Sequence, residues 1–193
     1  MTLRVIRRLA AALAPVVLCM TSALAAEVGG VRFDDQIRAG NAPLVLNGAG
    51  VRTKLVFKVY AMGLYLPQKA DSLAAIQKLD GPKRIELVTL RTLTSDQLSE
   101  ALVEGLQKNT NKAEYERLAS RVETLERIMA GIGKTSEGTH IQIDYANGET
   151  RIVVGGTPQG NAMAGDDFFQ ALLRIWLGNA PAQDDLKEKL LGR

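Results

Sequence analysis

The chain has 193 residues, with 24 Lys and Arg residues against 21 Asp and Glu, which gives a formal net charge of +3 at pH 7. It holds one histidine and one cysteine, too few for the usual zinc, haem or iron–sulfur sites. We therefore expect no metal site and no cofactor.

The N-terminal segment has the pattern of a secretory signal peptide. Arg4, Arg7 and Arg8 form a basic start, residues 9–20 form a short apolar core, and Ala23 to Ala25 offer small residues at the cleavage positions. Cleavage after Ala25 is expected, with a periplasmic or secreted location. The apolar run is too short for a comfortable membrane span, so the processed chain is not expected to cross a membrane.

Removal of residues 1–25 changes the charge balance. The segment holds three of the 24 basic residues and no acidic one, so residues 26–193 hold 21 basic and 21 acidic residues. Such a balance does not favour nucleic acid as a partner. Cys19 lies in the same segment, so disulfides and thiolate chemistry are excluded from the processed chain. Residues 26–193 show no sequence repeat and no linker, so they are expected to form one domain.

The first elements after the signal peptide are predicted to be strands. Residues 28–37 alternate, with Val31 and Phe33 on one face. A second strand begins at Ala42 and is expected to end in a turn at Asn47-Gly48.

A third strand is predicted from Leu55, with Leu55, Phe57 and Val59 on one face. It continues, or resumes after a bend at Gly63, until Pro67 stops it. If this strand is continuous through Arg52, that residue and Tyr60 share a face, eight residues apart.

Helices are predicted in the middle of the chain. A short helix at residues 71–81, with Asp71 as its N-cap, precedes a strand at 83–91. A helix at 94–109 starts with the capping-box spacing of Thr94 and Gln97. The next helix, at 111–133, carries apolar residues at steps of three and four: Tyr115, Leu118, Val122, Leu125, Met129 and Ile132. We expect this stripe to lie on a sheet; a coiled-coil partner is the alternative.

The last third combines a hairpin and two helices. Ile141, Ile143 and Tyr145 alternate before the turn residues Asn147-Gly148, and a return strand follows. Residues 155–167 are rich in glycine, and we expect a connecting loop, with a mobile lid over a pocket as the alternative. Helices are predicted at 166–178 and 182–192.

The order of elements predicts the fold class. Strands, helices, a hairpin and further helices follow one another without the regular alternation that builds a parallel sheet. We therefore expect an α+β fold, with a large, mainly antiparallel sheet and helices packed on one face.

Most familiar catalytic sets are absent. His140 falls on the polar phase of its strand and is expected to face solvent. The acidic pairs Asp34-Asp35, Asp166-Asp167 and Asp184-Asp185 are interpreted as caps and partners of helix dipoles. The glycines in Gly48-Ala49-Gly50 are too few, and wrongly flanked, for a phosphate-binding loop.

Arg52 remains as a candidate, because it stands between this glycine-rich stretch and a largely apolar run. A guanidinium offers a fork of donors that matches a carboxylate or another oxyanion. Arg52 therefore either ends a strand in solvent or binds an anion in a pocket, where Tyr60 would add a second donor.

The same residues carry a family resemblance. "LNGAGVRTKLVFKVYAMGLYLP", residues 46–67, resembles the signature of the chalcone isomerase-like family, in which a "GAGVR" turn precedes a "K-x-x-A-x-G-x-Y" strand. Residues 168–192 resemble the closing helices of its secreted bacterial branch. The resemblance covers essentially the whole processed chain. It implies an open-faced β-sandwich with a ligand cleft between sheet and helices.

The resemblance also implies a role for Arg52, because the matching arginine of the plant enzymes holds the phenolate that attacks an enone. The positions of their catalytic threonine, tyrosine and asparagine are occupied here by Tyr60, Leu98 and Gly105. Little is left to activate a ketone, so catalytic residues are not assigned. An arginine and a tyrosine are, however, the pair that the fatty-acid-binding branch uses for a carboxylate.

Three functions follow from these observations. The first is a non-catalytic periplasmic binder of a fatty acid or similar amphipathic acid, with Arg52, Tyr60, Leu98 and Gly105 as ligand-binding residues. The second is an isomerase or intramolecular lyase acting on an enone or phenolic substrate. The third is an envelope interaction module whose helix at 111–132 docks a partner. The sequence does not reveal the oligomeric state.

Overall fold

The computed structural model describes residues 25–193, so the predicted signal peptide lies outside the described residues except for Ala25. Among those residues, no helix is long and apolar enough to span a bilayer.

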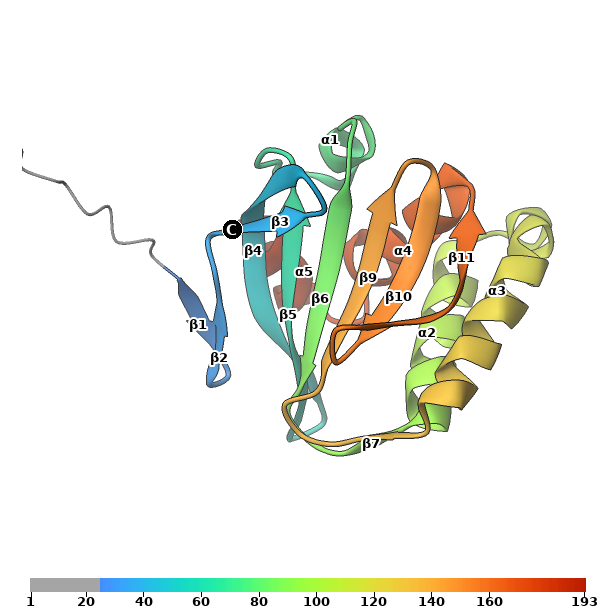
Figure 1. The fold of residues 1–193 in the computed structure, drawn as a ribbon, viewed down its shortest axis with the longest axis horizontal. Coiled ribbons are helices and arrows are strands. Elements are labelled where there is room, and N and C mark those ends of the chain that lie inside the picture. Colours follow the sequence, from blue (N-terminus) through green and yellow to red (C-terminus); the bar gives the residue numbers. More distant parts are fainter. Residues whose placement is uncertain (1–24) are drawn as a thin grey trace, which may run out of the picture.

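A large antiparallel sheet forms the centre of the described chain (Figure 1). Its strand order is β11-β10-β9-β6-β5-β4-β3, and every neighbouring pair is antiparallel. The strands are β3 (Gln36–Ala39), β4 (Ala42–Lys54), β5 (Phe57–Leu66), β6 (Lys83–Thr89), β9 (His140–Ala146), β10 (Glu149–Val154) and β11 (Thr157–Ala164).

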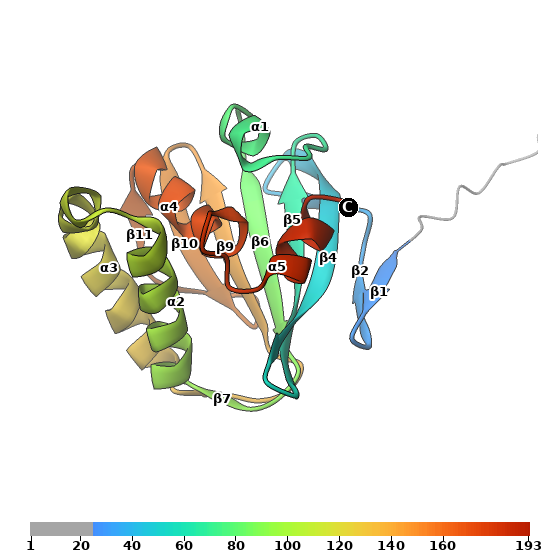
Figure 2. The same cartoon turned by 180° about the vertical axis from the view of Figure 1, so that it is seen from behind.

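Helices lie over one face of this sheet, as Figure 2 shows for α2, α4 and α5. The helices are α1 (Leu73–Gln77), α2 (Ser95–Asn109), α3 (Lys112–Ile132), α4 (Asp166–Leu177) and α5 (Asp184–Leu190). Two small ribbons complete the fold: β1 (Ala26–Val28) with β2 (Val31–Phe33), and β7 (Leu93–Thr94) with β8 (Lys134–Thr135). The predicted α+β fold is confirmed.

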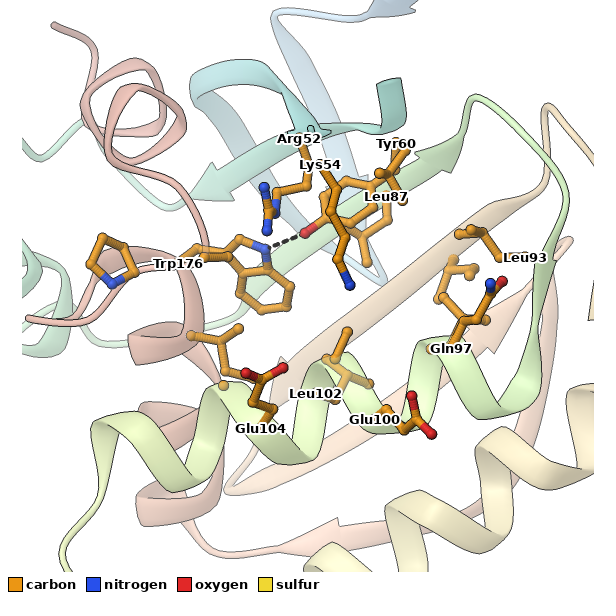
Figure 3. A pocket seen from close by; sticks show the side chains of 18 of the residues that line it. Arg52, Lys54, Tyr60, Leu87, Leu93, Gln97, Glu100, Leu102, Glu104 and Trp176 are labelled. Carbon is orange, nitrogen blue, oxygen red and sulfur yellow. Dashed lines mark hydrogen bonds between the residues drawn. The ribbon is translucent and has the colours of Figure 1, made fainter. Parts of the chain in front are cut away.

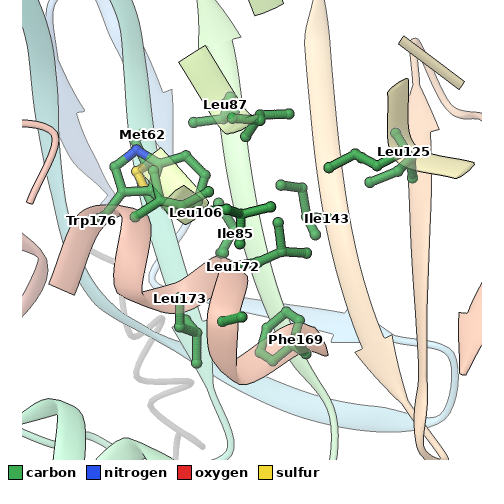
Figure 4. Close-up of a cluster of buried hydrophobic side chains, with 14 of the residues drawn as sticks. Met62, Ile85, Leu87, Leu106, Leu125, Ile143, Phe169, Leu172, Leu173 and Trp176 are labelled. Carbon is green, nitrogen blue, oxygen red and sulfur yellow. The ribbon is translucent and has the colours of Figure 1, made fainter. Parts of the chain in front are cut away.

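The main core fills the space between the sheet and its helices (Figure 4). Alternate residues of the central strands point inward, among them Met62, Ile85 and Ile143, and they meet Leu106 of α2 and Leu172 of α4. The predicted apolar stripe of α3 packs into the same core, since Leu118, Val122, Leu125 and Met129 are all buried. Such burial of a continuous apolar surface is the main stabilising term of the fold.

The opposite face of the sheet carries a smaller apolar cluster under the β1–β2 ribbon. Phe33 lies on Gly63 there, since a Cβ atom at Gly63 would stand 2.7 Å from Cδ1 of Phe33. Gly63 therefore lies inside a continuous β5 and allows close packing. Elsewhere this face is polar, as in the bidentate pair of Arg84 and Asp144, with N–O distances of 2.5 and 2.7 Å.

The predicted turn at Asn47-Gly48 is wrong. β4 runs through both residues, with a register shift between Leu46 and Gly48. Asn47 is buried and its side chain binds distant backbone: Nδ2 donates to the carbonyls of Ala70 (2.9 Å) and Leu190 (2.7 Å), and Oδ1 accepts from Ala70 N (2.7 Å). These tertiary partners replace the local bonds of an asparagine turn.

The turn lies instead at Leu55-Val56, between β4 and β5. Leu55 has a φ of 57° and is 89% exposed, so the prediction that Leu55 and Phe57 share one strand face is also wrong. The apolar character of both turn residues hid the turn, because turns are recognised by glycine, asparagine and proline.

Two further predictions need correction. The N-cap of α1 is Ser72, not Asp71, and its Oγ accepts a 3.3 Å hydrogen bond from Ala75 N. The glycine-rich stretch at 155–167 is mostly the edge strand β11, so neither a connecting loop nor a lid describes it. The predicted hairpin turn at Asn147-Gly148 is confirmed by φ angles of 53° and 77°.

Candidate ligand cavity

The glycines of the Gly48-Ala49-Gly50 stretch let α5 lie directly on β4. A Cβ atom at Gly48 would stand 2.0 Å from the carbonyl oxygen of Lys189, and one at Gly50 would stand 2.7 Å from Cδ1 of Leu186. The Asn47 amide, which donates to the Leu190 carbonyl, fixes the other end of the same helix. This stretch is therefore a docking surface for the last helix.

Docking of α5 brings its N-cap residue, Gln183, beside Arg52. Gln183 Oε1 accepts from Thr53 N at 2.7 Å and from Arg52 Nη1 at 3.1 Å, while Gln183 Nε2 donates to Val51 O at 3.3 Å. Arg52 Nη1 also donates to the carbonyl of Thr53. All hydrogen bonds of this guanidinium to residues 25–193 use Nη1, and Nε and Nη2 donate to none of these residues.

Arg52 and Tyr60 are direct partners across β4 and β5. They share a face, as predicted, but they do so as neighbours on two strands and not as distant residues on one. Trp176 Nε1 on α4 donates a 2.8 Å hydrogen bond to the Tyr60 hydroxyl oxygen (Figure 3). Burial raises the pKa of Tyr60, and the Trp176 bond and the Arg52 charge oppose this only in part, so the phenol stays protonated.

A cavity of about 520 Å³ opens between the sheet and α2, with Arg52 and Tyr60 in its wall. Its volume falls within the range of about 300–1,000 Å³ that is usual for small-molecule sites. The lining is mainly apolar: Val59, Leu87, Leu93, Leu98, Ala101, Leu102, Met129, Ile141, Ile143, Ile175 and Trp176. Figure 3 shows the Arg52 and Tyr60 side chains on the sheet side, facing Leu102 of α2.

A family model described as chalcone isomerase-like matches residues 25–192. The chain belongs to the chalcone isomerase-like family. Among solved structures, a fatty-acid binding protein of Arabidopsis thaliana is similar in fold, with a TM-score of 0.62 and 17% sequence identity. The match covers 84% of this chain and 92% of the plant protein. A comparison with curated protein sequences found no match.

The remaining two positions expected from the chalcone isomerase-like family, Leu98 and Gly105, lie on α2 and line the same cavity. Gly105 has a packing role, because a Cβ atom there would stand 2.6 Å from Cγ2 of Ile175 on α4. All four predicted site residues thus meet at one cavity. Whether they contact a ligand stays a prediction.

Sequence reasoning missed several residues of this site. Gln183 was not singled out because its bonds to Arg52 and Thr53 cross 130 or more residues. Trp176 is one of the buried apolar residues of α4, and the sequence gives no separate signal for its indole N–H. Lys54 and Arg91 also line the cavity, as does the Lys108–Glu104 pair, which is 2.6 Å apart.

His140 lies away from the cavity. Its Nδ1 is 2.9 Å from Glu86 Oε1, and half of its side chain is exposed, as the sequence predicted. Residues 25–193 contain no group of three or more His, Cys, Asp or Glu side chains able to hold a metal ion. The polar side chains that line the cavity are those of Arg52, Lys54, Tyr60, Arg91, Gln97, Glu100, Glu104 and Lys108.

Proposed function

We propose that this protein binds a fatty acid or a similar amphipathic carboxylate, without catalysis, in the cavity between its sheet and α2. The observation that carries the proposal is the pair of Arg52 and Tyr60, with free donors at one end of a cavity that is otherwise mainly apolar. A guanidinium and a phenol beside a mainly apolar wall are the complement of an amphipathic acid.

The head group would bind to two side chains that are already held in place. Gln183 and the Thr53 carbonyl fix Nη1 of Arg52, which leaves Nε and Nη2 to donate to a carboxylate. Trp176 uses the Tyr60 oxygen as an acceptor, so the phenolic proton is left to donate. Because these groups are positioned before binding, little conformational entropy is lost when the acid arrives.

The tail would lie along the apolar wall that the central strands and α2 provide. Leu87, Ile141 and Ile143 line it from the sheet, and Leu98 and Leu102 line it from α2. Each methylene buried there contributes about 0.8 kcal/mol before the costs of ordering the chain. This wall favours a flexible alkyl tail over a polar one.

The binder is favoured over an isomerase by the composition of the wall. Leu98 and Gly105 present no polar side-chain atom at positions where the plant enzymes of the family use a phenol and an amide. These two positions therefore offer an enone carbonyl no stabilisation of its developing charge. Absorbance measurements with a chalcone test this alternative, and a rate above that of buffer would favour the isomerase.

The solved structure of the Arabidopsis protein, described as fatty-acid binding, has the same fold and supports a ligand of this class. The interaction-module alternative is not supported by the apolar stripe of α3, because that stripe is buried in the core. We also propose a periplasmic or secreted location and a place in the secreted bacterial branch, on the pattern of residues 1–25 and the closing helices. Cell fractionation and N-terminal sequencing test the location.

The test of the main proposal uses the processed protein purified from cells. Native mass spectrometry should detect a co-purified acid, and calorimetric titration with palmitate should give a measurable affinity. Arg52→Ala should weaken that affinity about tenfold or more, because a charge-assisted pair is lost. Arg38→Ala, at an exposed position on β3, is the matched control and should bind normally. No bound acid and no effect of Arg52→Ala would refute the proposal.

A further inference from the structure

The tip of the β4–β5 hairpin exposes three consecutive apolar residues to solvent. Leu55 is 89% exposed, Val56 84% and Phe57 54%, and they are the large hydrophobic residues exposed in the described chain. Single exposed apolar residues are common on protein surfaces, but a run of three at a protruding turn is a small apolar patch.

The backbone conformation at this tip does not favour the apolar residue found there. Leu55 has a φ of 57°, the conformation that glycine takes at the first central position of a two-residue hairpin turn. Positive φ is unfavourable for a branched, bulky side chain. A leucine at this position therefore indicates that its side chain contacts a partner outside the folded chain.

Cations surround the patch. Lys54 and Lys58 flank it on the two strands and both are exposed, and the guanidinium carbon of Arg91 lies 5.1 Å from the centre of the Phe57 ring. Residues 53–59 contain no acid. Glu100 and Glu104 line the same cavity; Glu104 is paired with Lys108 at 2.6 Å, and its pKa is lowered mainly by Lys108 and to a lesser extent by Lys54.

The same tip borders the cavity. Leu55, Phe57, Lys54 and Arg91 all line it, so the patch lies where the cavity meets solvent. Figure 1 shows this turn at the end of the sheet opposite α1, beside the connections that carry β7 and β8. A surface that contacted the tip would therefore also face the cavity.

We propose that the hairpin tip docks on an anionic lipid surface. Leu55, Val56 and Phe57 enter the interface between head groups and acyl chains, while Lys54, Lys58 and Arg91 meet the lipid phosphates. The docking proposal depends only on the exposed apolar patch and on the cations around it. Its purpose, passage of an acid between bilayer and cavity, rests on the function proposed above.

Charge favours lipid over a second copy of this chain as the occupant. Two tips brought together would place Lys54, Lys58 and Arg91 of one copy against the same cations of the other, which disfavours the pairing. A fluid surface also accommodates a protruding tip without a preformed groove.

The experiment is flotation of the processed protein with vesicles, after mass spectrometry has established that residues 1–25 are absent. Binding is expected to vesicles of phosphatidylglycerol and phosphatidylcholine, much less to phosphatidylcholine alone, and to fall with salt. Val56→Ser should reduce the partition coefficient about tenfold and Lys58→Gln about fivefold, because an inserted side chain and a phosphate contact are lost.

Both variants change exposed residues outside the cavity lining, so their fold and their affinity for palmitate should be unchanged. Lys69→Gln, which removes an exposed lysine before α1, is the matched charge control and should float like the unaltered protein. Equal flotation of Val56→Ser, Lys58→Gln and the unaltered protein would overturn the proposal. So would no preference for anionic vesicles, or sedimentation as a dimer that Val56→Ser dissociates.

The two proposals fail separately. Palmitate titration is performed without vesicles, so loss of tip-dependent flotation with intact palmitate binding would refute lipid docking alone. Tip-dependent flotation of a protein that carries no bound acid, and whose Arg52→Ala variant shows no loss of affinity, would confirm docking and refute the binder.

Discussion

The indole N–H of Trp176 on α4 donates to the hydroxyl oxygen of Tyr60 on β5, at a distance of 2.8 Å. Tyr60 is in turn the cross-strand partner of Arg52, whose guanidinium is held by Gln183 at the start of α5. A helix, two strands and a second helix thus position the two donors proposed to bind a carboxylate. Each link can be tested by one substitution.

Tyr60→Phe should weaken both binding and stability. Loss of the phenolic donor removes a hydrogen bond to a charged guest, so palmitate affinity should fall about tenfold or more. The buried N–H of Trp176 loses its partner, and the free energy of unfolding should fall by about 1–3 kcal/mol. Calorimetry and urea unfolding measure the two effects.

The control is Tyr115→Phe, since the Tyr115 hydroxyl accepts only an exposed, 3.4 Å bond from Gln107. It should change stability by no more than about 0.5 kcal/mol and should leave affinity unchanged. If the two variants behave alike, the Tyr60 hydroxyl has no special role.

Gly48→Ala should displace α5. The added Cβ would stand 2.0 Å from the Lys189 carbonyl, which cannot move without the helix, so the free energy of unfolding should fall by about 3 kcal/mol. Palmitate affinity should fall as well, because Gln183 moves with α5. Gly131→Ala on α3 is the control: its Cβ meets nothing within 4 Å, and it should stabilise the helix by about 1 kcal/mol. A Gly48→Ala protein of full stability would contradict the docking role.

Gln183 variants test how Arg52 is positioned. Gln183→Ala frees the guanidinium and should weaken palmitate binding about fivefold, with little loss of stability, because the bonds it makes are partly exposed. Gln183→Glu should weaken binding further, since a carboxylate there would pair with Arg52 and repel the acid. Gln68→Ala, at an exposed position, should bind normally. Stronger binding by Gln183→Glu would refute a carboxylate guest at Arg52.

Stability should fall at alkaline pH. Burial raises the pKa of Tyr60 and Tyr65 above the ordinary value of 10.0, and burial together with the Asp166 hydrogen bond raises that of Tyr145 to about 12. The unfolded chain therefore loses these phenolic protons first. The free energy of unfolding should be unaffected by them below pH 10 and should decrease as pH rises from 10 towards the folded-state values. Urea unfolding across this range, with phenolate absorbance, measures the effect; a rise in stability would contradict it.

The sequence by itself determined the elements whose signals are local. The 3–4 spacing of α3, the Thr94 capping box and the Asn147-Gly148 turn all depend on residues within a few positions of one another, and each forms as predicted. The α+β class followed from the order of these elements. Leu98 and Gly105 were identified as candidate site residues from the family resemblance, and not from the pattern of residues.

Tertiary structure alone decided where the chain turns around Arg52 and what holds that side chain. The sequence predicts a turn at Asn47, but the amide of this residue binds the carbonyls of Ala70 and Leu190. The turn occurs instead at the apolar pair Leu55-Val56. Gln183 reaches Arg52 only because the glycines of β4 let α5 approach, a contact that spans more than 100 residues. Local patterns report backbone preference and burial, whereas a site assembled across strands and helices depends on packing that no short stretch encodes.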